Sequence, residues 1–203
     1  MNPYYDDGRG IVIYHGDCRE ILPSLSKVEA VVTDPPYGVE GGHGGQNRDC
    51  LKANYLGAWK DNPEYIKNIC VPVIKSCIAM ADCVAFTPGT RCTFSYPQPD
   101  DIGCFWFPAA PRRGRFGFAT FNPILYYGRN WLSGRAQTPS GIVVTERAEE
   151  NGHPCPKPFK AWRWLVQKCC SPNGIVLDPF MGSGTTLRAA KDLGRKAIGI
   201  EIE

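Results

Sequence analysis

The chain has 203 residues, of which 43% are hydrophobic and 21% are charged, with a formal net charge of +3. These values are typical of a soluble globular chain with one substantial core, so we expect a single domain over residues 1–203. No apolar run approaches the roughly 20 residues that a membrane-spanning helix needs, and the polar start MNPYYDDGRG is unlike a secretory signal, so we expect a cytoplasmic protein with no membrane partner.

Short β-rich runs alternate with helical stretches along the chain, a pattern that favours parallel strands joined by crossover helices. Strands are expected at 11–14, 29–33, 83–89, 175–180 and 196–203. Two aromatic-rich segments are expected to form an antiparallel pair, 103–108 and 122–128. Helices are expected at 61–81 with a kink or interruption at Pro72, at 157–170, and in the second part of 182–194.

The ten cysteines form neither a metal-binding nor a disulfide pattern. None falls into a C-x-x-C pair and the chain has three histidines, whereas structural zinc needs four converging ligands, commonly in two close pairs. Several cysteines lie within apolar runs such as SCIAMADCVAF, where a reduced thiol behaves as a small hydrophobic group. We therefore expect reduced, mostly structural cysteines and no metal site.

The stretch VVTDPPYGV, residues 31–39, ends a buried apolar strand with an acid, two prolines and an aromatic ring. Prolines cannot continue the strand, and they hold the backbone rigid. A carboxylate, a rigid turn and a flat ring at one strand end suit a preorganised binding site. The other interpretation of this stretch is an ordinary proline turn.

The stretch LDPFMGSGTT lies between an expected strand and an expected helix. A glycine-rich turn at such a junction lets backbone N–H groups and the helix N-terminus approach a ligand. Glu201 follows Asp178 by 23 positions, at the end of the next strand, and an acid at about this spacing binds ribose hydroxyls in nucleoside sites. The pattern predicts an adenosine-like ligand, although two threonines follow Gly184 where a dinucleotide fingerprint would continue; the alternative is a tight turn without a ligand.

Together, DPPYG and DPFMGSGTT resemble the amino-methyltransferases that modify exocyclic amines of DNA bases with S-adenosylmethionine. DPPY precedes the glycine-rich turn, as in the circularly permuted β group of N6-adenine and N4-cytosine DNA methyltransferases. Three further segments fit the same pattern: HGDCREIL at 15–22, HPCPKP at 153–158 and the terminal GIEIE.

The resemblance implies an α/β fold of the Rossmann-like class I methyltransferase type. Its doubly wound, mostly parallel sheet has seven strands with an antiparallel edge hairpin, and in this chain no helix follows the last strand. We expect a catalytic half over 1–100, an arginine- and aromatic-rich hairpin and DNA-facing loop over 101–152, and a cofactor-binding half over 153–203.

The resemblance also implies a role for individual residues. The catalytic positions are Asp34, Pro35, Pro36 and Tyr37: the Asp34 carboxylate and the Pro35 carbonyl accept from the amine, and the Tyr37 ring stacks on a base removed from the duplex. The implied S-adenosylmethionine-binding positions are Asp17, Cys18, Lys157, Asp178, Pro179, Phe180, Gly182, Ser183, Gly184, Thr185, Thr186, Glu201 and Ile202.

The expected partner is double-stranded DNA. No acidic residue occurs from Ile102 to Thr145, a segment rich in aromatic residues, and cations with stacking surfaces suit a DNA contact. The same segment supplies the candidate DNA-binding residues Arg112, Arg113, Arg115, Arg129 and Arg135. The alternative is a solvated basic surface.

In the group that the sequence resembles, an aspartate before PPY goes mainly with transfer to the N6 amine of adenine, so the resemblance favours adenine N6, and N4 of cytosine is the alternative. More distant alternatives for the methylated group are an adenine in RNA and a glutamine amide in a protein. An alternative of another class is a truncated and inactive DNA- or cofactor-binding module, which is consistent with the absence of a helix after the last strand but is opposed by the intact DPPY tetrad at 34–37. The middle of the chain is short for a separate target-recognition domain, so either the recognised sequence is brief or a partner subunit, such as a second copy in a homodimer, contributes.

Overall fold

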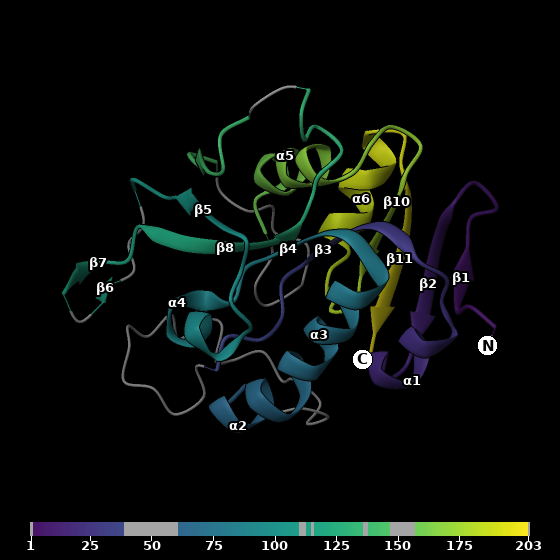
Figure 1. Ribbon diagram of the computed structural model, residues 1–203, viewed down its shortest axis with the longest axis horizontal. Coiled ribbons are helices and arrows are strands. Elements are labelled where there is room, and N and C mark those ends of the chain that lie inside the picture. The colour runs from purple at the N-terminus through teal and green to yellow at the C-terminus, as the bar shows by residue number, and fades with distance from the viewer. Residues whose placement is uncertain are drawn as a thin grey trace.

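The computed structural model describes residues 2–38, 61–109, 113–114, 116–135, 138–146 and 157–202. In this part of the chain, nine strands form one sheet in the order β1-β2-β11-β10-β3-β4-β8-β5-β9 (Figure 1). The strands are β1 (Tyr5–Asp6), β2 (Ile11–His15), β3 (Val28–Thr33), β4 (Ala81–Phe86), β5 (Asp101–Trp106), β8 (Phe121–Gly128), β9 (Ile142–Val143), β10 (Ile175–Asp178) and β11 (Lys196–Glu201). A separate small hairpin pairs β6 (Arg113–Gly114) with β7 (Gly117–Phe118).

The expected mostly parallel, doubly wound sheet is confirmed. Strands β2, β11, β10, β3 and β4 are parallel neighbours. Within the described residues, seven strands of this sheet have four or more residues, and β1 and β9 add two-residue strands at its edges. Strand β10 ends at Asp178, two residues earlier than expected, because the backbone turns there toward the glycine-rich segment.

The expected antiparallel pair is formed by β5 and β8. Cys104 lies opposite Pro123 in this pair, and β8 is also antiparallel to β4. Strand β8 therefore starts at the edge where the parallel strands end. This reversal determines which of its residues reach the site described below.

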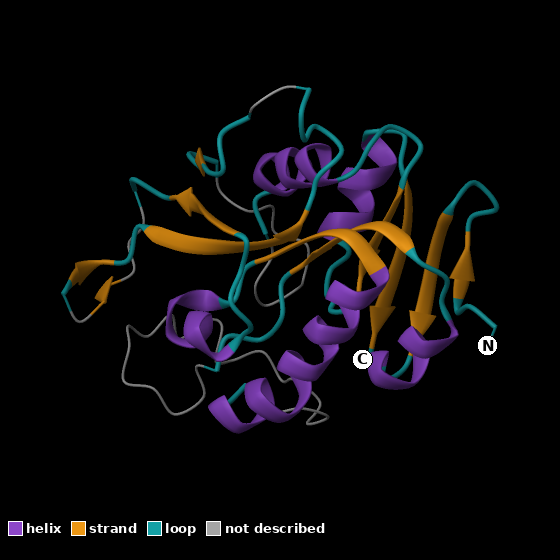
Figure 2. Ribbon diagram, in the orientation of Figure 1, coloured by secondary structure: helices purple, strands orange, loops and turns teal. Residues whose placement is uncertain are grey.

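Helices cover both faces of the sheet (Figures 1 and 2). They are α1 (Cys18–Ile21), α2 (Pro63–Tyr65), α3 (Val71–Met80), α4 (Gly89–Cys92), α5 (Phe159–Cys169) and α6 (Thr185–Asp192), with 3-10 turns at Leu22–Ser24 and Thr93–Ser95. Helices α5 and α6 lie on one face, and α1 to α4 lie on the other (Figure 1). Among the helices that the structure describes, none is both long and apolar enough to cross a bilayer.

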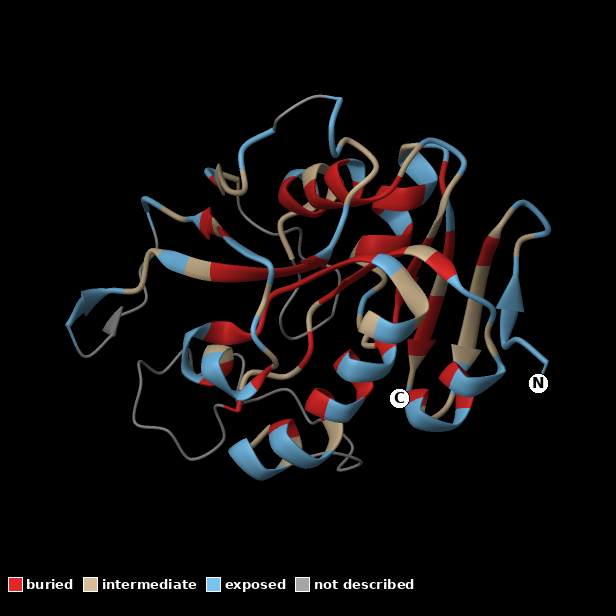
Figure 3. Cartoon of the chain, in the orientation of Figure 1, coloured by how far each residue is buried: buried red, intermediate tan, exposed pale blue. Residues whose placement is uncertain are grey.

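Residues of β4 alternate between the two cores because successive strand side chains point to opposite faces. Cys83 and Ala85 pack on the α5 side, and Val84 and Phe86 pack on the α3 side. Buried residues accordingly run along the central strands and the facing sides of the helices (Figure 3). A strand covered on both faces has a continuous apolar sequence, which is why these strands were detectable.

The helix expected over 61–81 begins at Pro63, after Asn62 caps it by accepting the Tyr65 N–H at 2.8 Å. The kink or interruption expected at Pro72 takes the form of a change in helix type just before this proline. A π-helical turn at Ile66–Cys70 precedes it, and the helix then continues to Met80. The wider turn accommodates a proline that can neither donate a hydrogen bond nor pack closely on the preceding turn.

We predict that α5 depends on Leu165 for its attachment to the sheet. The Leu165 side chain is completely buried, so Leu165→Ala should lower the free energy of unfolding by about 2–5 kcal/mol in urea denaturation. Gln167→Ala is the matched control because Gln167 is exposed on the same helix, and its effect should stay within about 0.5 kcal/mol. Equal losses in the two variants would contradict this packing.

Candidate active site

Polar side chains from five strands meet at one edge of the sheet. Glu201 ends β11, Asp178 ends β10, Asp34 follows β3, and Thr87 follows β4. Asn122 joins them from the start of β8, because that strand runs in the opposite direction. The carboxyl ends of parallel strands are the usual ligand-binding edge of such sheets.

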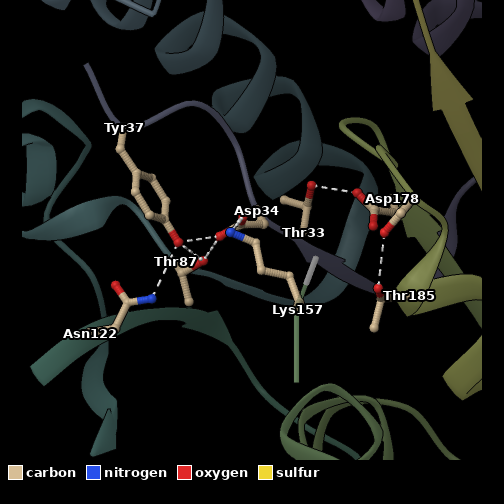
Figure 4. A network of polar contacts seen from close by, with 9 residues as sticks. Thr33, Asp34, Tyr37, Thr87, Asn122, Lys157, Asp178 and Thr185 are labelled. Carbon is tan, nitrogen blue, oxygen red and sulfur yellow. Dashed lines mark hydrogen bonds and ion pairs between the residues drawn. The ribbon is translucent and has the colours of Figure 1, made fainter. Parts of the chain in front are cut away.

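Asp34 is the centre of a polar network at this edge (Figure 4). Its Oδ1 accepts from the Tyr37 hydroxyl at 2.5 Å and from the Thr87 hydroxyl. Its Oδ2 forms an ion pair with the Lys157 ammonium. Asn122 Nδ2 donates to the Tyr37 hydroxyl at 3.2 Å. The structure therefore joins the first predicted motif to three residues that lie far away in the sequence.

Tyr37 is held as a proton donor. Burial, reinforced by the nearby Asp34 carboxylate, raises the pKa of its hydroxyl well above the ordinary value, so the phenol keeps its proton. The ring contacts Gly89, where an added Cβ would lie 2.7 Å from Tyr37 Cγ and where φ is +67°. Glycine is required at position 89 for both reasons. The Lys157 ammonium lies 5.0 Å from the centroid of the same ring.

The end of the DPPYG turn is anchored by a distant acid. The Gly38 N–H donates to the Asp61 carboxylate, and the Cys92 thiol donates to the Tyr37 carbonyl at 3.3 Å. These contacts fix the backbone that carries the Tyr37 ring. The glycine-rich segment GGHGGQN, residues 41–47, lies outside the described residues.

Asp178 is buried beside the first motif. Its Oδ1 accepts from the Thr33 hydroxyl at 2.6 Å and from the Phe180 N–H at 3.1 Å. The pKa of Asp178 is raised to about 6, mainly by burial and also by the charge of Asp34, while hydrogen bonds from Thr186 and Thr33 oppose the shift. The two motifs are thus neighbours in space, and the charge of Asp34 affects the pKa of Asp178.

The glycine-rich turn connects β10 to α6 and leaves open space beside its backbone. The Gly182 N–H donates to Glu201 Oε2 at 2.5 Å, and the Ile202 N–H donates to Oε1 at 3.0 Å. Gly184 precedes α6 with φ +75°, and no heavy atom lies within 4 Å of where its Cβ would be. Thr185 points toward Asp178 at the start of the helix (Figure 4). An open backbone turn, a helix N-terminus and a carboxylate acceptor fit a nucleoside carrying an amino-acid group.

Asp17 and Cys18 reach the same edge, since β2 pairs with β11 and His15 lies opposite Glu201. The Asp17 carboxylate caps α1 and accepts from the Arg19 N–H at 2.8 Å and from its guanidinium, and these bonds lower its pKa. Burial raises the pKa of the Cys18 thiol to about 12. A nucleoside role for this pair stays a prediction.

The predicted arginines are not gathered at one place. Arg129 follows Gly128, which lies opposite Cys83 near the start of β4, and its N–H donates to the Asp82 carbonyl. Arg129 and the exposed Arg135 therefore lie at the sheet edge opposite to Asp34. Arg113 belongs to β6, in the hairpin between β5 and β8 at the Asp34 edge. Two further candidates lie outside the described residues, Arg112 and Arg115.

Sequence reasoning missed Thr87 and Asn122. Thr87 follows a strand just as Asp34 does, so its position after the CVAF run was a usable signal. Asn122 opens an antiparallel strand and points to the site because of the β4–β8 register. That register is not visible in the sequence.

The comparisons with known proteins agree on one family. A family model described as DNA methylase matches residues 95–203. The type II methyltransferase M.ScaI of Streptomyces caespitosus is 26% identical over 245 residues, covering 98% of this chain and 79% of that protein. The solved M1.HpyAVI–SAM complex gives a TM-score of 0.65 at 22% identity over 94% of this chain and 92% of that one. The PvuII cytosine-N4-specific DNA methyltransferase gives 0.62 at 16% identity over 96% and 82%.

We predict a pH-dependent contribution of Asp178 to stability. Because its folded pKa of about 6 exceeds the ordinary aspartate value of 3.8, folding favours the protonated carboxyl. The contribution is complete below about pH 4 and is lost as the pH rises through 6. The unfolding free energy of wild type minus that of Asp178→Asn should therefore fall by about 2–3 kcal/mol between pH 4 and 7 in urea denaturation. A constant or rising difference would contradict the buried carboxyl.

Proposed function

The chain belongs to the N6/N4 DNA methylase family, and from that premise we propose that it transfers a methyl group from S-adenosylmethionine to the N6 amine of an adenine in double-stranded DNA. The observation that carries the proposal is the Asp34 network, which places a carboxylate acceptor next to the glycine-rich turn. The family match begins after the DPPY segment. The role of that segment therefore rests on its geometry and on its resemblance to the family motif.

S-adenosylmethionine, when bound, supplies an electrophilic methyl group on a sulfonium. In this chain Gly182 and Gly184 would lie along its methionine part, and the Thr185 hydroxyl would donate to its carboxylate. Glu201 would accept from the ribose hydroxyls, since a carboxylate offers about four acceptor positions. The remaining predicted cofactor positions stay a prediction from the family resemblance.

Asp34 acts by orientation. An exocyclic amine is a weak nucleophile because its lone pair is delocalised into the ring, and acceptors on its N–H groups favour a pyramidal, more reactive nitrogen. Asp34 and the Pro35 carbonyl are the proposed acceptors. Thr87 and the neutral Tyr37 donate to Asp34 Oδ1 and hold the carboxylate in one orientation. Such preorganisation is the main contribution that a protein makes to a transfer between two bound groups.

Asp34 also supports adenine as the substrate base. In the group that the sequence resembles, aspartate at this position accompanies adenine and serine accompanies cytosine. The fold does not discriminate, because the PvuII cytosine-N4-specific enzyme gives a TM-score of 0.62 with this chain. Cytosine N4 is therefore the alternative product.

The hairpin at the Asp34 edge supports DNA as the partner. Phe116 and Phe118 are 100% and 66% exposed there, and Trp106 and Phe121 at the adjoining strand ends are each 44% exposed. Exposed rings stack on bases irrespective of sequence, and nearby cations contact phosphates. Of the arginines that the acid-free segment from Ile102 to Thr145 supplies, Arg113 belongs to this hairpin, whereas Arg129 and Arg135 lie at the opposite edge of the sheet.

The proposal predicts N6-methyladenine in unmethylated bacterial DNA incubated with the purified chain and S-adenosylmethionine, measured by mass analysis of the nucleosides. Asp34→Ala should lower the rate about 10²–10³-fold, because a preorganised polar group is lost. Asp101→Ala is the matched control, since Asp101 is exposed at the opposite end of β5. N4-methylcytosine would overturn the choice of base. Cofactor and DNA binding without any product would favour the inactive binding module.

Thr87→Val removes the hydroxyl donor to Asp34 at nearly constant volume. We expect kcat to fall about 10-fold, as for one hydrogen bond to a charged group, with the cofactor affinity unchanged in calorimetry. Thr93→Val is the control, because its hydroxyl bonds only the Gly89 carbonyl among the contacts described. An unchanged kcat in Thr87→Val would contradict the orienting role.

A further inference from the structure

Lys157 contacts the two groups that would bind the proposed substrate base, the Asp34 carboxylate and the Tyr37 ring. Its ammonium pairs with Asp34 Oδ2 and lies 5.0 Å from the centroid of the Tyr37 ring. The lysine side chain is 20% exposed and that of Asp34 is 14% exposed, so little solvent screens the pair. One cation thus contacts both the acceptor for the amine and the ring for stacking.

The contacts of Asp34 leave the substrate amine no easy access. Oδ1 already accepts from Thr87 and Tyr37, and Oδ2 faces the ammonium of Lys157. A neutral amine makes a weaker bond to a carboxylate than an ammonium does. Separating the Lys157 ammonium from Asp34 would leave two partly buried charges unpaired, which is costly. A second anion that pairs with the ammonium offsets part of that cost.

Lys157 is also placed between the two halves of the site. It lies two residues before α5, and the first residue of that helix, Phe159, packs under the Arg188 guanidinium of α6 at 4.4 Å. Helix α6 begins directly after the glycine-rich turn. Figure 4 shows the lysine side chain reaching Asp34 while Asp178 and Thr185 lie on its other side.

We propose that Lys157 makes cofactor binding a precondition for base binding. This inference rests on the proposed function. The amino-acid carboxylate of the cofactor attracts the Lys157 ammonium away from Asp34, and the flexible four-carbon stem permits that movement. Asp34 Oδ2 and the Tyr37 ring then become accessible to the base. Before the cofactor binds, the lysine blocks the base-binding position.

The test is a double-mutant cycle on cofactor-analogue binding without DNA, measured by calorimetry. The probes are S-adenosylhomocysteine, which carries the carboxylate, and 5′-methylthioadenosine, which lacks it. The proteins are wild type, Asp34→Asn, Lys157→Met and the double variant, with Asp101→Asn as the control. Methylthioadenosine binding should be equal in all of them, which also reports an intact fold.

Asp34→Asn should tighten S-adenosylhomocysteine binding about 5-fold, because the ammonium is released from its partner beforehand. Lys157→Met should weaken it about 10-fold. In the Lys157→Met background, Asp34→Asn should leave the affinity for S-adenosylhomocysteine unchanged.

An equal gain in both backgrounds would overturn the proposal, because Asp34 would then act on the ligand carboxylate directly by charge repulsion. The proposal would also be overturned if Asp34→Asn failed to increase the affinity for S-adenosylhomocysteine in both backgrounds. These outcomes are distinct from a failure of the proposed function, which would appear as an absence of binding by both probes or as the absence of methylated base in the DNA assay.

Discussion

The site depends on the parallel pairing of β3 with β10. Val176 lies opposite Ala30 and Leu177 lies opposite Val31, which joins segments about 145 positions apart. Because the two strands are parallel, the segments that follow them leave the sheet at the same edge. The bond from Thr33 to Asp178 closes this contact just beyond the pairing. A slip of one residue would turn each side chain to the other face and separate the two motifs.

Two acids beside each other at a buried edge are costly, and the surrounding donors offset that cost. Asp178 is almost fully buried and retains a raised pKa despite its hydrogen bonds. Asp34 is compensated by the Thr87 and Tyr37 hydroxyls and by Lys157. The chain therefore places polar groups at this edge in sets, in which each carboxylate has donors from neighbouring elements.

The same arrangement connects packing to function. Strands with two covered faces give the edge a rigid base, and the turns that leave it carry the chemistry. Gly89 lets the Tyr37 ring pack against the backbone after β4, and this contact fixes the position of the ring. Lys157 reaches the ring and Asp34 from the segment before α5. A change in the position of α5 would therefore alter the contacts of Lys157 with Asp34, the proposed acceptor.

The sequence by itself determined the α/β class, the seven main strands and the two motifs, because apolar runs, prolines and glycines act through local geometry. It did not reveal that Thr87 and Asn122 complete the Asp34 network or that Arg129 lies at the far edge. Those features depend on strand order, on the reversed direction of β8 and on register. Only the tertiary structure decides them, because each arises from contacts between segments that the chain separates by tens of residues.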